Sequence, residues 1–126
     1  MGVKSPLEIS ATFGILFNAR DREGMLALYT TDGILTIDGE TLAQGRDAIG
    51  EMMGEMLDSP LTITTRCATC HVNGDTALVR TDWTLTDPEG KEFMTGSSAE
   101  VLGRQADGLW RFIIDDASFS SRLASS

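Results

Sequence analysis

The chain has 126 residues, of which 41% are hydrophobic, and its 10 basic and 19 acidic residues give a net charge of −9. This length suffices for one domain with its own hydrophobic core, so we expect residues 1–126 to form a single domain. The negative charge disfavours nucleic acids and anionic membranes as partners, because both attract basic surfaces. No stretch approaches the roughly 18 continuous apolar residues of a membrane span.

The opening segment MGVKSPLEIS lacks the apolar run of a secretion signal. Gly2 does not begin a myristoylation pattern, because Pro6 stands where that pattern needs Ser or Thr. We therefore expect a cytoplasmic protein. In that reducing compartment, Cys67 and Cys70 are expected to remain free thiols.

The first helix is predicted to begin at Ser5. This residue is a favourable N-cap, Pro6 suits the first helical position, and Glu8 completes a capping box. Apolar residues then recur at helical spacing and predict a buried stripe, which consists of Ile9, Phe13, Leu16 and Phe17.

Two further helices are predicted before the middle of the chain. Asp21 is a suitable cap for a short second helix. A third helix is expected to start after Gly45 and to end before Pro60, which cannot continue it. The apolar face of this third helix consists of Ile49, Met53, Met56 and Leu57.

The remaining segments predict antiparallel strands. Residues 34–45, ILTIDGETLAQG, predict a hairpin with a two-residue loop at Asp38-Gly39. Strands rich in β-branched residues follow the third helix, separated by turn signals, at residues 61–72, 76–86, 91–104 and 109–119. Because these strands are segregated from the helices, the fold class is expected to be α+β, with the helices on one face of an antiparallel sheet.

The strings ARDREGMLALYTTDGILTIDG, GRDAIGEMM and DGLWRFIIDDAS occur in this order along the chain. Together they resemble the nuclear transport factor 2-like superfamily, and its SnoaL-like branch in particular. The resemblance covers nearly the whole chain. It implies three N-terminal helices packed on a strongly curved antiparallel sheet, which forms a cone around the first helix with a pocket open at one end. It also implies a homodimer through the outer face of the sheet.

The superfamily that the chain resembles includes ketosteroid isomerases, dehydratases, polyketide cyclases and epoxide hydrolases, as well as binding and association domains without chemistry. The isomerase reaction needs a carboxylate base and an oxyanion hole made of a tyrosine and a protonated aspartate. Ungapped matching places the base at Ile37, the tyrosine at Phe13 and the second acid near Ala99. None of the three is kept, so a ketosteroid isomerase is disfavoured.

The last predicted strand offers a candidate acid–base group. By the two-residue period, one face of this strand contains Trp110, Phe112, Ile114 and Asp116. The large apolar residues place this face inward, so Asp116 is expected to point into the apolar cone near its open end. Burial there raises the pKa of a carboxyl group and suits it to general acid–base catalysis. The alternative is a rim position in water or a hydrogen bond to a neighbouring strand.

Three further residues are weaker candidates for proton transfer or for orienting a polar ligand group: His71, Tyr29 and Trp83. Trp83 shares a face with apolar residues of its strand and is expected in the inner wall. His71 is the only histidine of the chain, and the side of the sheet on which it lies stays open. Glu100 is expected to be exposed, because neither face of its strand is clearly apolar; the alternative is a second acid in the pocket.

The pocket is expected to be lined mainly by apolar and aromatic residues, which favour an apolar or aromatic ligand. The predicted lining residues are Phe13, Phe17, Tyr29, Leu35, Ile37, Met53, Met56, Trp83, Trp110, Phe112 and Ile114. We expect no metal site, since one histidine and two cysteines give no zinc-binding spacing. We expect no cofactor, since no glycine-rich phosphate loop occurs.

The string CATCH, from Cys67 to His71, matches the attachment motif of c-type haem. It lies in a predicted strand, where side chains alternate between the two faces, so Cys67 and Cys70 are expected to project to opposite sides. A covalent haem needs both thiols and the histidine at one porphyrin, so the haem interpretation is disfavoured.

The sequence therefore predicts a small cone-shaped domain that binds a small apolar or aromatic molecule, with acid–base chemistry of the isomerase, cyclase, dehydratase or hydrolase type. Asp116 is the first candidate for the acid–base group. The alternative is a non-catalytic homodimeric module for ligand binding or association, which the missing isomerase residues favour. Two convergent titratable groups in the cavity would favour an enzyme, and a wholly apolar cavity would favour the binding module.

Overall fold

The computed structural model describes the backbone of residues 1–123 and the side chains of residues 1–117. In this part of the chain, the helical segments are the 3₁₀-helix η1 (Pro6–Glu8), α1 (Ile9–Asn18), α2 (Arg22–Leu26) and α3 (Arg46–Leu57). The strands are β1 (Tyr29–Thr36), β2 (Leu42–Gln44), β3 (Thr62–Asn73), β4 (Thr76–Thr86), β5 (Glu92–Arg104) and β6 (Trp110–Leu123). The α+β class is confirmed. None of these helices is long and apolar enough to cross a membrane.

The helical segments η1 and α2 begin at the capping residues that the sequence predicted. Ser5 caps η1 with its side chain, and its backbone N–H donates to Oε2 of Glu8 at 2.9 Å, so both halves of the capping box are present. This first turn is a 3₁₀ turn that runs directly into α1. The second cap is at Asp21, whose Oδ1 accepts from the backbone N–H of Gly24 at 2.9 Å and starts α2.

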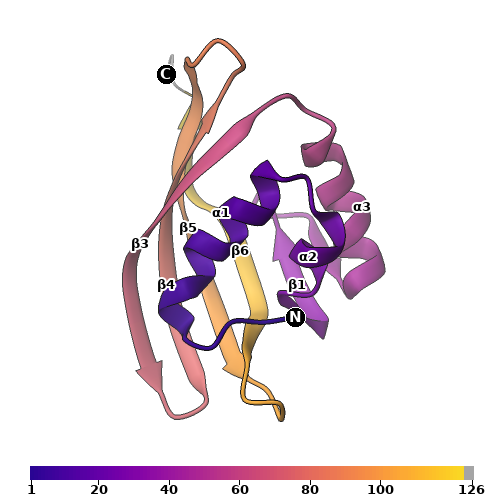
Figure 1. Ribbon diagram of the computed structural model, residues 1–126, viewed down its shortest axis with the longest axis vertical. Coiled ribbons are helices and arrows are strands. Elements are labelled where there is room, and N and C mark those ends of the chain that lie inside the picture. The colour runs from indigo at the N-terminus through magenta and orange to yellow at the C-terminus, as the bar shows by residue number, and fades with distance from the viewer. Residues whose placement is uncertain (124–126) are drawn as a thin grey trace.

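The strands form one sheet in the order β2-β1-β6-β5-β4-β3. Neighbouring strands are antiparallel except β1 and β6, which run parallel, so the sheet is mixed and the prediction of a purely antiparallel sheet is wrong. The parallel pair arises because α3 and the meander of β3 to β5 separate β1 from β6, and the chain returns in the direction of β1. Figure 1 shows the curved sheet with α1 lying across its concave side and α2 and α3 beside it.

The loop between β1 and β2 is longer than predicted. The last pair of this hairpin joins Thr36 to Leu42, so residues 37–41 form the loop instead of two residues at Asp38 and Gly39. Oδ1 of Asp38 accepts hydrogen bonds from the two backbone N–H groups that lie two and three residues later, at 2.8 and 2.6 Å. These bonds hold the pKa of Asp38 below its ordinary value and build the turn from a side chain.

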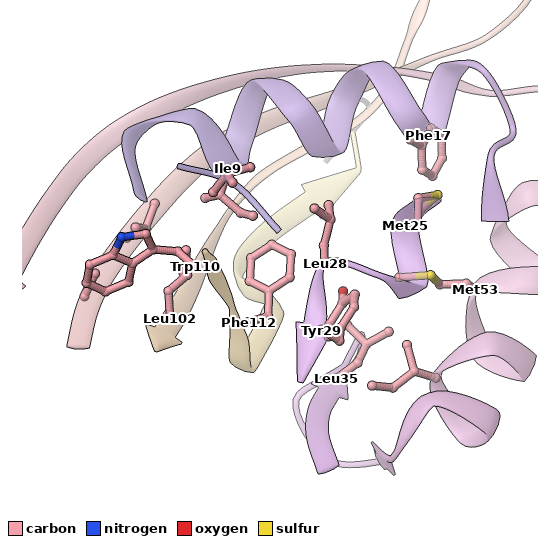
Figure 2. Packing of buried hydrophobic residues seen from close by; sticks show 14 of the residues in the cluster. Ile9, Phe17, Met25, Leu28, Tyr29, Leu35, Met53, Leu102, Trp110 and Phe112 are labelled. Carbon is pink, nitrogen blue, oxygen red and sulfur yellow. The ribbon is translucent and has the colours of Figure 1, made fainter. Parts of the chain in front are cut away.

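The hydrophobic core lies between the helices and the concave side of the sheet (Figure 2). At its centre, the ring of Phe112 lies 4.8 Å from that of Tyr29 and 6.3 Å from that of Phe13, measured between centroids. The largest fully buried side chains are Tyr29, Phe17, Ile9, Met25, Leu28, Ile49, Met53, Leu102 and Val79. These side chains come from all the α-helices and from the sheet, so the core fixes α1 on its concave side.

Helix α1 packs closely on β3 at Gly14. A Cβ atom at Gly14 would lie 2.7 Å from Oγ1 of Thr65, closer than real side chains come. The same Thr65 hydroxyl donates to the backbone carbonyl of Ser10 at 2.7 Å. The absence of a side chain at Gly14 therefore lets β3 hydrogen-bond to α1, and this contact positions Ser10 over the sheet.

We expect Gly14→Ala to destabilise the protein. Alanine gains roughly 0.5–1 kcal/mol in a helix interior, but overpacking against Thr65 costs about 1–3 kcal/mol. Urea denaturation measures the free energy of unfolding. The matched control is Gly54→Ala in α3, where a Cβ atom meets nothing within 4 Å and the change is expected to stabilise. Stabilisation by both substitutions would contradict the close packing of α1 on β3.

Candidate functional site

Unbroken alternation along β5 decides the direction of Glu100. A bulge at Phe93, which has no partner on β4, affects only the start of the strand, because the pairs from Met94 to Gly103 are continuous. Glu100 pairs with Val79 and lies two residues before the core residue Leu102, so it faces the concave side of the sheet, where it is only 3% exposed. The expectation that Glu100 is exposed is wrong.

A second bulge decides the direction of the acids on β6. Ile113 is the unpaired residue, because Phe112 and Ile114 pair with consecutive residues of β5. Past this bulge, Asp115 faces the concave side and is 5% exposed, whereas Ile114 is 40% exposed. The predicted inward direction of Asp116 and Ile114 is therefore wrong, because the prediction assumed an unbroken two-residue period.

A cavity of about 290 Å³ lies between α1, the end of α3 and the concave side of β3 to β6. Its wall is mainly apolar and includes five of the predicted lining residues: Phe13, Ile37, Met56, Trp83 and Phe112. Polar groups line it from five elements: they are the carboxyl groups of Glu100 and Asp115 and the hydroxyls of Ser10, Thr65, Thr81 and Ser98. An apolar cavity with a few convergent polar groups is the usual form of a small-molecule site.

The other predicted lining residues lie elsewhere. Five of them belong to the buried core instead of the cavity wall: Phe17, Tyr29, Leu35, Met53 and Trp110. Figure 2 shows Phe17 and Met53 close to Met25 of α2, whereas Trp110 lies at the other end of the core, near Ile9 and Leu102. His71 is exposed and pairs with Leu78, which is 47% exposed, so His71 lies on the outer face and away from the cavity.

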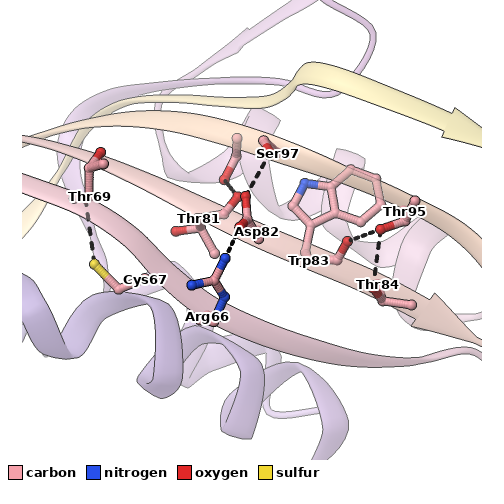
Figure 3. Close-up of polar contacts among 10 residues, drawn as sticks. Arg66, Cys67, Thr69, Thr81, Asp82, Trp83, Thr84, Thr95 and Ser97 are labelled. Carbon is pink, nitrogen blue, oxygen red and sulfur yellow. Dashed lines mark hydrogen bonds and ion pairs between the residues drawn. The ribbon is translucent and has the colours of Figure 1, made fainter.

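Strand β4 shows the alternation that the sequence predicted. Thr81 and Trp83 line the cavity, whereas Asp82 between them bonds to Arg66 at 2.5 Å on the other face (Figure 3). Nε1 of Trp83 donates to the backbone carbonyl of Ala117 at 3.0 Å. Its indole N–H is thus used by β6, which leaves the apolar ring as the part of Trp83 that forms the wall.

Glu100 is held by a chain of hydroxyl groups. Oγ1 of Thr81 donates to Oε1 of Glu100 at 2.6 Å, and Oγ of Ser10 lies 2.7 Å from Oγ1 of Thr81. The other carboxyl oxygen, Oε2, is buried and has no hydrogen-bond partner within the described residues. Burial, reinforced by the negative charge of Asp115, raises the pKa of Glu100 to about 8, so this carboxyl group is neutral at pH 7.

Asp115 is held by Tyr29. The Tyr29 hydroxyl donates to Oδ2 of Asp115 at 2.6 Å. Burial raises the pKa of Asp115 to about 6, and the bond from Tyr29 acts in the opposite direction. Burial and the neighbouring carboxylate raise the pKa of Tyr29 well above its ordinary value, so its hydroxyl keeps its proton. At pH 7 the cavity therefore contains one neutral acid, Glu100, and one carboxylate, Asp115.

The cysteines lie on one side of the sheet. Ala68 is a bulge in β3, because Cys67 and Thr69 pair with consecutive residues of β4. Cys67 and Cys70 therefore both face the concave side as half-buried free thiols, and the prediction of opposite faces is wrong. Sγ of Cys67 lies 3.5 Å from the carbonyl oxygen of Thr69 (Figure 3). No cluster of three or more metal-ligating side chains occurs within the described residues.

The sequence profile of the SnoaL-like domain matches residues 11–116, and the chain belongs to this family. The resemblance predicted from the sequence is thus confirmed. No curated protein matches the chain.

Solved structures share the fold. A protein of unknown function with a cystatin-like fold from Nostoc punctiforme is 19% identical over 92% of both chains, with a TM-score of 0.77. A ketosteroid isomerase-like protein from Erwinia carotovora atroseptica is 22% identical over 95% of both chains, with a TM-score of 0.74. A putative calcium/calmodulin-dependent protein kinase type II association domain from Thiobacillus denitrificans is 20% identical over 92% of this chain and 95% of its own, with a TM-score of 0.78.

We expect Glu100 to make the folded state less stable as the pH rises. The folded protein keeps the proton of Glu100 up to about pH 8, whereas the unfolded chain releases it near 4.5. Between these values the folded state binds more protons, so the free energy of unfolding falls with increasing pH. Urea denaturation from pH 5 to pH 9 is expected to show a flatter profile for Glu100→Gln. The exposed Glu92→Gln on the same strand is the control, and equal slopes for both variants would contradict the burial of an acid at Glu100.

Proposed function

We propose that the chain binds a small apolar or aromatic molecule in this cavity and performs acid–base chemistry on it, with Glu100 as the general acid and Asp115 as the general base. The observation that carries the proposal is the presence of two buried carboxyl groups, one neutral and one ionised at pH 7, in one apolar cavity. Two titratable groups whose pKa values are driven apart by their surroundings can divide the roles of acid and base.

Each carboxyl group suits its role. Asp115 is a carboxylate at pH 7 and can accept a proton from the ligand, while Tyr29 keeps it in place. Glu100 is neutral and can deliver a proton to another atom of the ligand. Isomerisation and dehydration need one such transfer in each direction, whereas hydrolysis also needs water as a second reactant. We therefore favour proton transfer at a carbon next to a carbonyl or hydroxyl group.

The likeness to the ketosteroid isomerase-like protein from Erwinia supports the fold of the proposed enzyme but not its residues. Two of the positions that the sequence comparison assigned to isomerase groups, Phe13 and Ile37, are apolar residues of the cavity wall. The acids of this chain come instead from β5 and β6. The proposed chemistry is thus carried by residues of this chain alone.

We expect the protein to accelerate hydrogen–deuterium exchange at the methyl group of 2-acetylnaphthalene in D₂O. This neutral aromatic ketone suits an apolar cavity, and exchange requires a base at the methyl carbon and an acid at the carbonyl oxygen. Proton NMR measures the rate. Asp115→Asn is expected to lower it by roughly 10²–10⁴-fold, because general-base catalysis contributes about that much.

Asp116→Asn is the matched control, since Asp116 is the next residue on β6 and does not line the cavity. It is expected to lower the exchange rate far less than Asp115→Asn does, because Asp116 acts on the two acids only through its charge. Broadening of the ketone signals by the protein without faster exchange would contradict the acid–base chemistry and favour the non-catalytic binding module. Equal loss in Asp115→Asn and Asp116→Asn would contradict the assignment of the base.

We also propose that the chain is a homodimer through the outer face of the sheet. An apolar row crosses this face, since Leu78, Val101, Ile114 and Ile34 occupy paired positions on β4, β5, β6 and β1. Leu78 is 47% exposed and Ile114 is 40% exposed, and burying such side chains favours association. The same row supports the alternative function, a non-catalytic association module.

Leu78→Asp is expected to convert the dimer into a monomer, because it places a charge in the proposed apolar interface. Sedimentation velocity at tens of micromolar protein measures the change. Leu42→Asp is the control, because Leu42 is 62% exposed but lies on the edge strand β2. A monomeric wild-type protein at this concentration would contradict the proposal.

We also propose that the protein is cytoplasmic. Cys67 and Cys70 support this proposal, because both are unpaired thiols on one face of β3, and free thiols persist in reducing compartments. Fractionation of cells that express the chain with its natural flanking sequence tests the location.

A further inference from the structure

We propose that Glu100 and Asp115 hold one proton between them, as a carboxyl–carboxylate pair, and that Thr81 and Tyr29 position it there. The inference rests on the proposed function, because the same two acids carry both. It adds that the acid and the base act as one unit. The position of their shared proton is fixed by residues on α1, β4 and β1. Thr81, Ser10 and Tyr29 are then positioning residues.

The register of the sheet places the two acids against each other. Glu100 and Asp115 are directly paired across β5 and β6. Directly opposed residues of an antiparallel pair have their Cβ atoms about 4.5–5.5 Å apart and project to the same face. Both side chains are almost fully buried, at 3% and 5% exposure. Two carboxyl groups at this separation in an apolar cavity cannot both be ionised without strong repulsion, so one proton stays with the pair.

The hydroxyl contacts assign the position of that proton. Thr81 donates to Oε1 of Glu100, so Oε1 is the accepting carbonyl oxygen and the proton of the neutral acid belongs on Oε2. The hydroxyl of Ser10 lies 2.7 Å from that of Thr81, whose own proton is used by Glu100, so Ser10 donates to Thr81. The chain of hydroxyls thus runs in one direction, from α1 through β4 to β5.

Oε2 of Glu100 needs a partner that accepts. It is buried and has no hydrogen-bond donor among the described residues, and an unsatisfied buried oxygen costs about 1–3 kcal/mol. A proton on Oε2 makes this oxygen a donor, and the carboxylate of Asp115 on the paired position is the matching acceptor. Tyr29 already donates to Oδ2 of Asp115, which leaves Oδ1 for the proton of Glu100.

The ionisable groups around the pair fit this arrangement. Asp115 acts on Glu100 from β6, and Asp116 adds negative charge from the other face of the same strand. Tyr29 faces Asp115 from β1 and keeps its proton. The remaining groups that face Glu100 are uncharged hydroxyls, those of Ser10 on α1, Thr81 on β4 and Ser98 on β5 itself. The site therefore carries one negative charge when it holds one proton, and it favours a neutral ligand over an anion.

The test is a carbon-13 NMR titration of the side-chain carboxyl groups in the full chain. The signals of Glu100 and Asp115 are assigned from Glu100→Gln and Asp115→Asn. In Asp115→Asn, the pKa of Glu100 is expected to fall by at least about one unit, because the negative neighbour is gone. In Glu100→Met, the pKa of Asp115 is expected to rise, because the carboxylate loses its donor. Simple burial without a shared proton predicts no rise.

Thr81 provides a matched pair of variants. Thr81→Val keeps the shape but removes the donor to Oε1, and it is expected to raise the pKa of Glu100 and to move the infrared carbonyl stretch of its protonated form to higher frequency. Thr81→Ser keeps the hydroxyl and is expected to restore both values. Equal spectra for Thr81→Val and the wild type would overturn the assignment of the proton to Oε2.

The outcomes separate the two proposals. If Glu100 is ionised at pH 7 in the wild type, the proposed general acid is absent and the proposed function fails with the pair. If Glu100 is neutral at pH 7 but the pKa of Asp115 does not rise in Glu100→Met, only the shared proton is overturned. Asp116→Asn is the control, because it removes a nearby negative charge that is not paired with Glu100. It is expected to lower the pKa of Glu100 less than Asp115→Asn does.

Discussion

The strict alternation of side chains along a β-strand is the constraint on which this site depends. One unpaired residue reverses the two faces of everything that follows it. Ile113 does this in β6 and turns Asp115 toward the cavity, opposite Glu100 on β5. Without this bulge Asp115 would lie on the other face of the sheet, and Ile114 would lie opposite Glu100.

Burial raises the pKa of each of the two acids and hydrogen bonds lower it. The balance of these two effects differs between Glu100 and Asp115. For Glu100, burial outweighs the hydrogen bonds from Ser98 and Thr81, and its pKa rises to about 8. For Asp115, the bond from Tyr29 limits the rise, and its pKa is about 6. The opposed positions on β5 and β6 place the two acids side by side, so this difference supports the proposed division into a general acid and a general base.

The same packing that builds the fold also positions the acids. The close approach of α1 to β3 at Gly14 lets Thr65 bind the carbonyl of Ser10, whose hydroxyl then reaches Thr81. Tyr29 is a core residue whose ring packs against that of Phe112 at a tilt, and its hydroxyl donates to Asp115. Core packing and proton positioning are therefore not separable in this domain, and substitutions in the core are expected to alter the site.

The sequence by itself determined the order of the elements, the capped starts at Ser5 and Asp21, and the family, because capping and apolar periodicity are local properties that neighbouring residues decide. Only the tertiary structure decided the parallel pairing of β1 with β6 and the faces of Glu100 and Asp115. A bulge depends on how two strands pair with each other and pack against the core. The residue pattern of a single strand therefore does not predict it. For that reason the sequence predicted an acid on β6 but assigned it to Asp116, one residue away from the buried carboxyl group of Asp115.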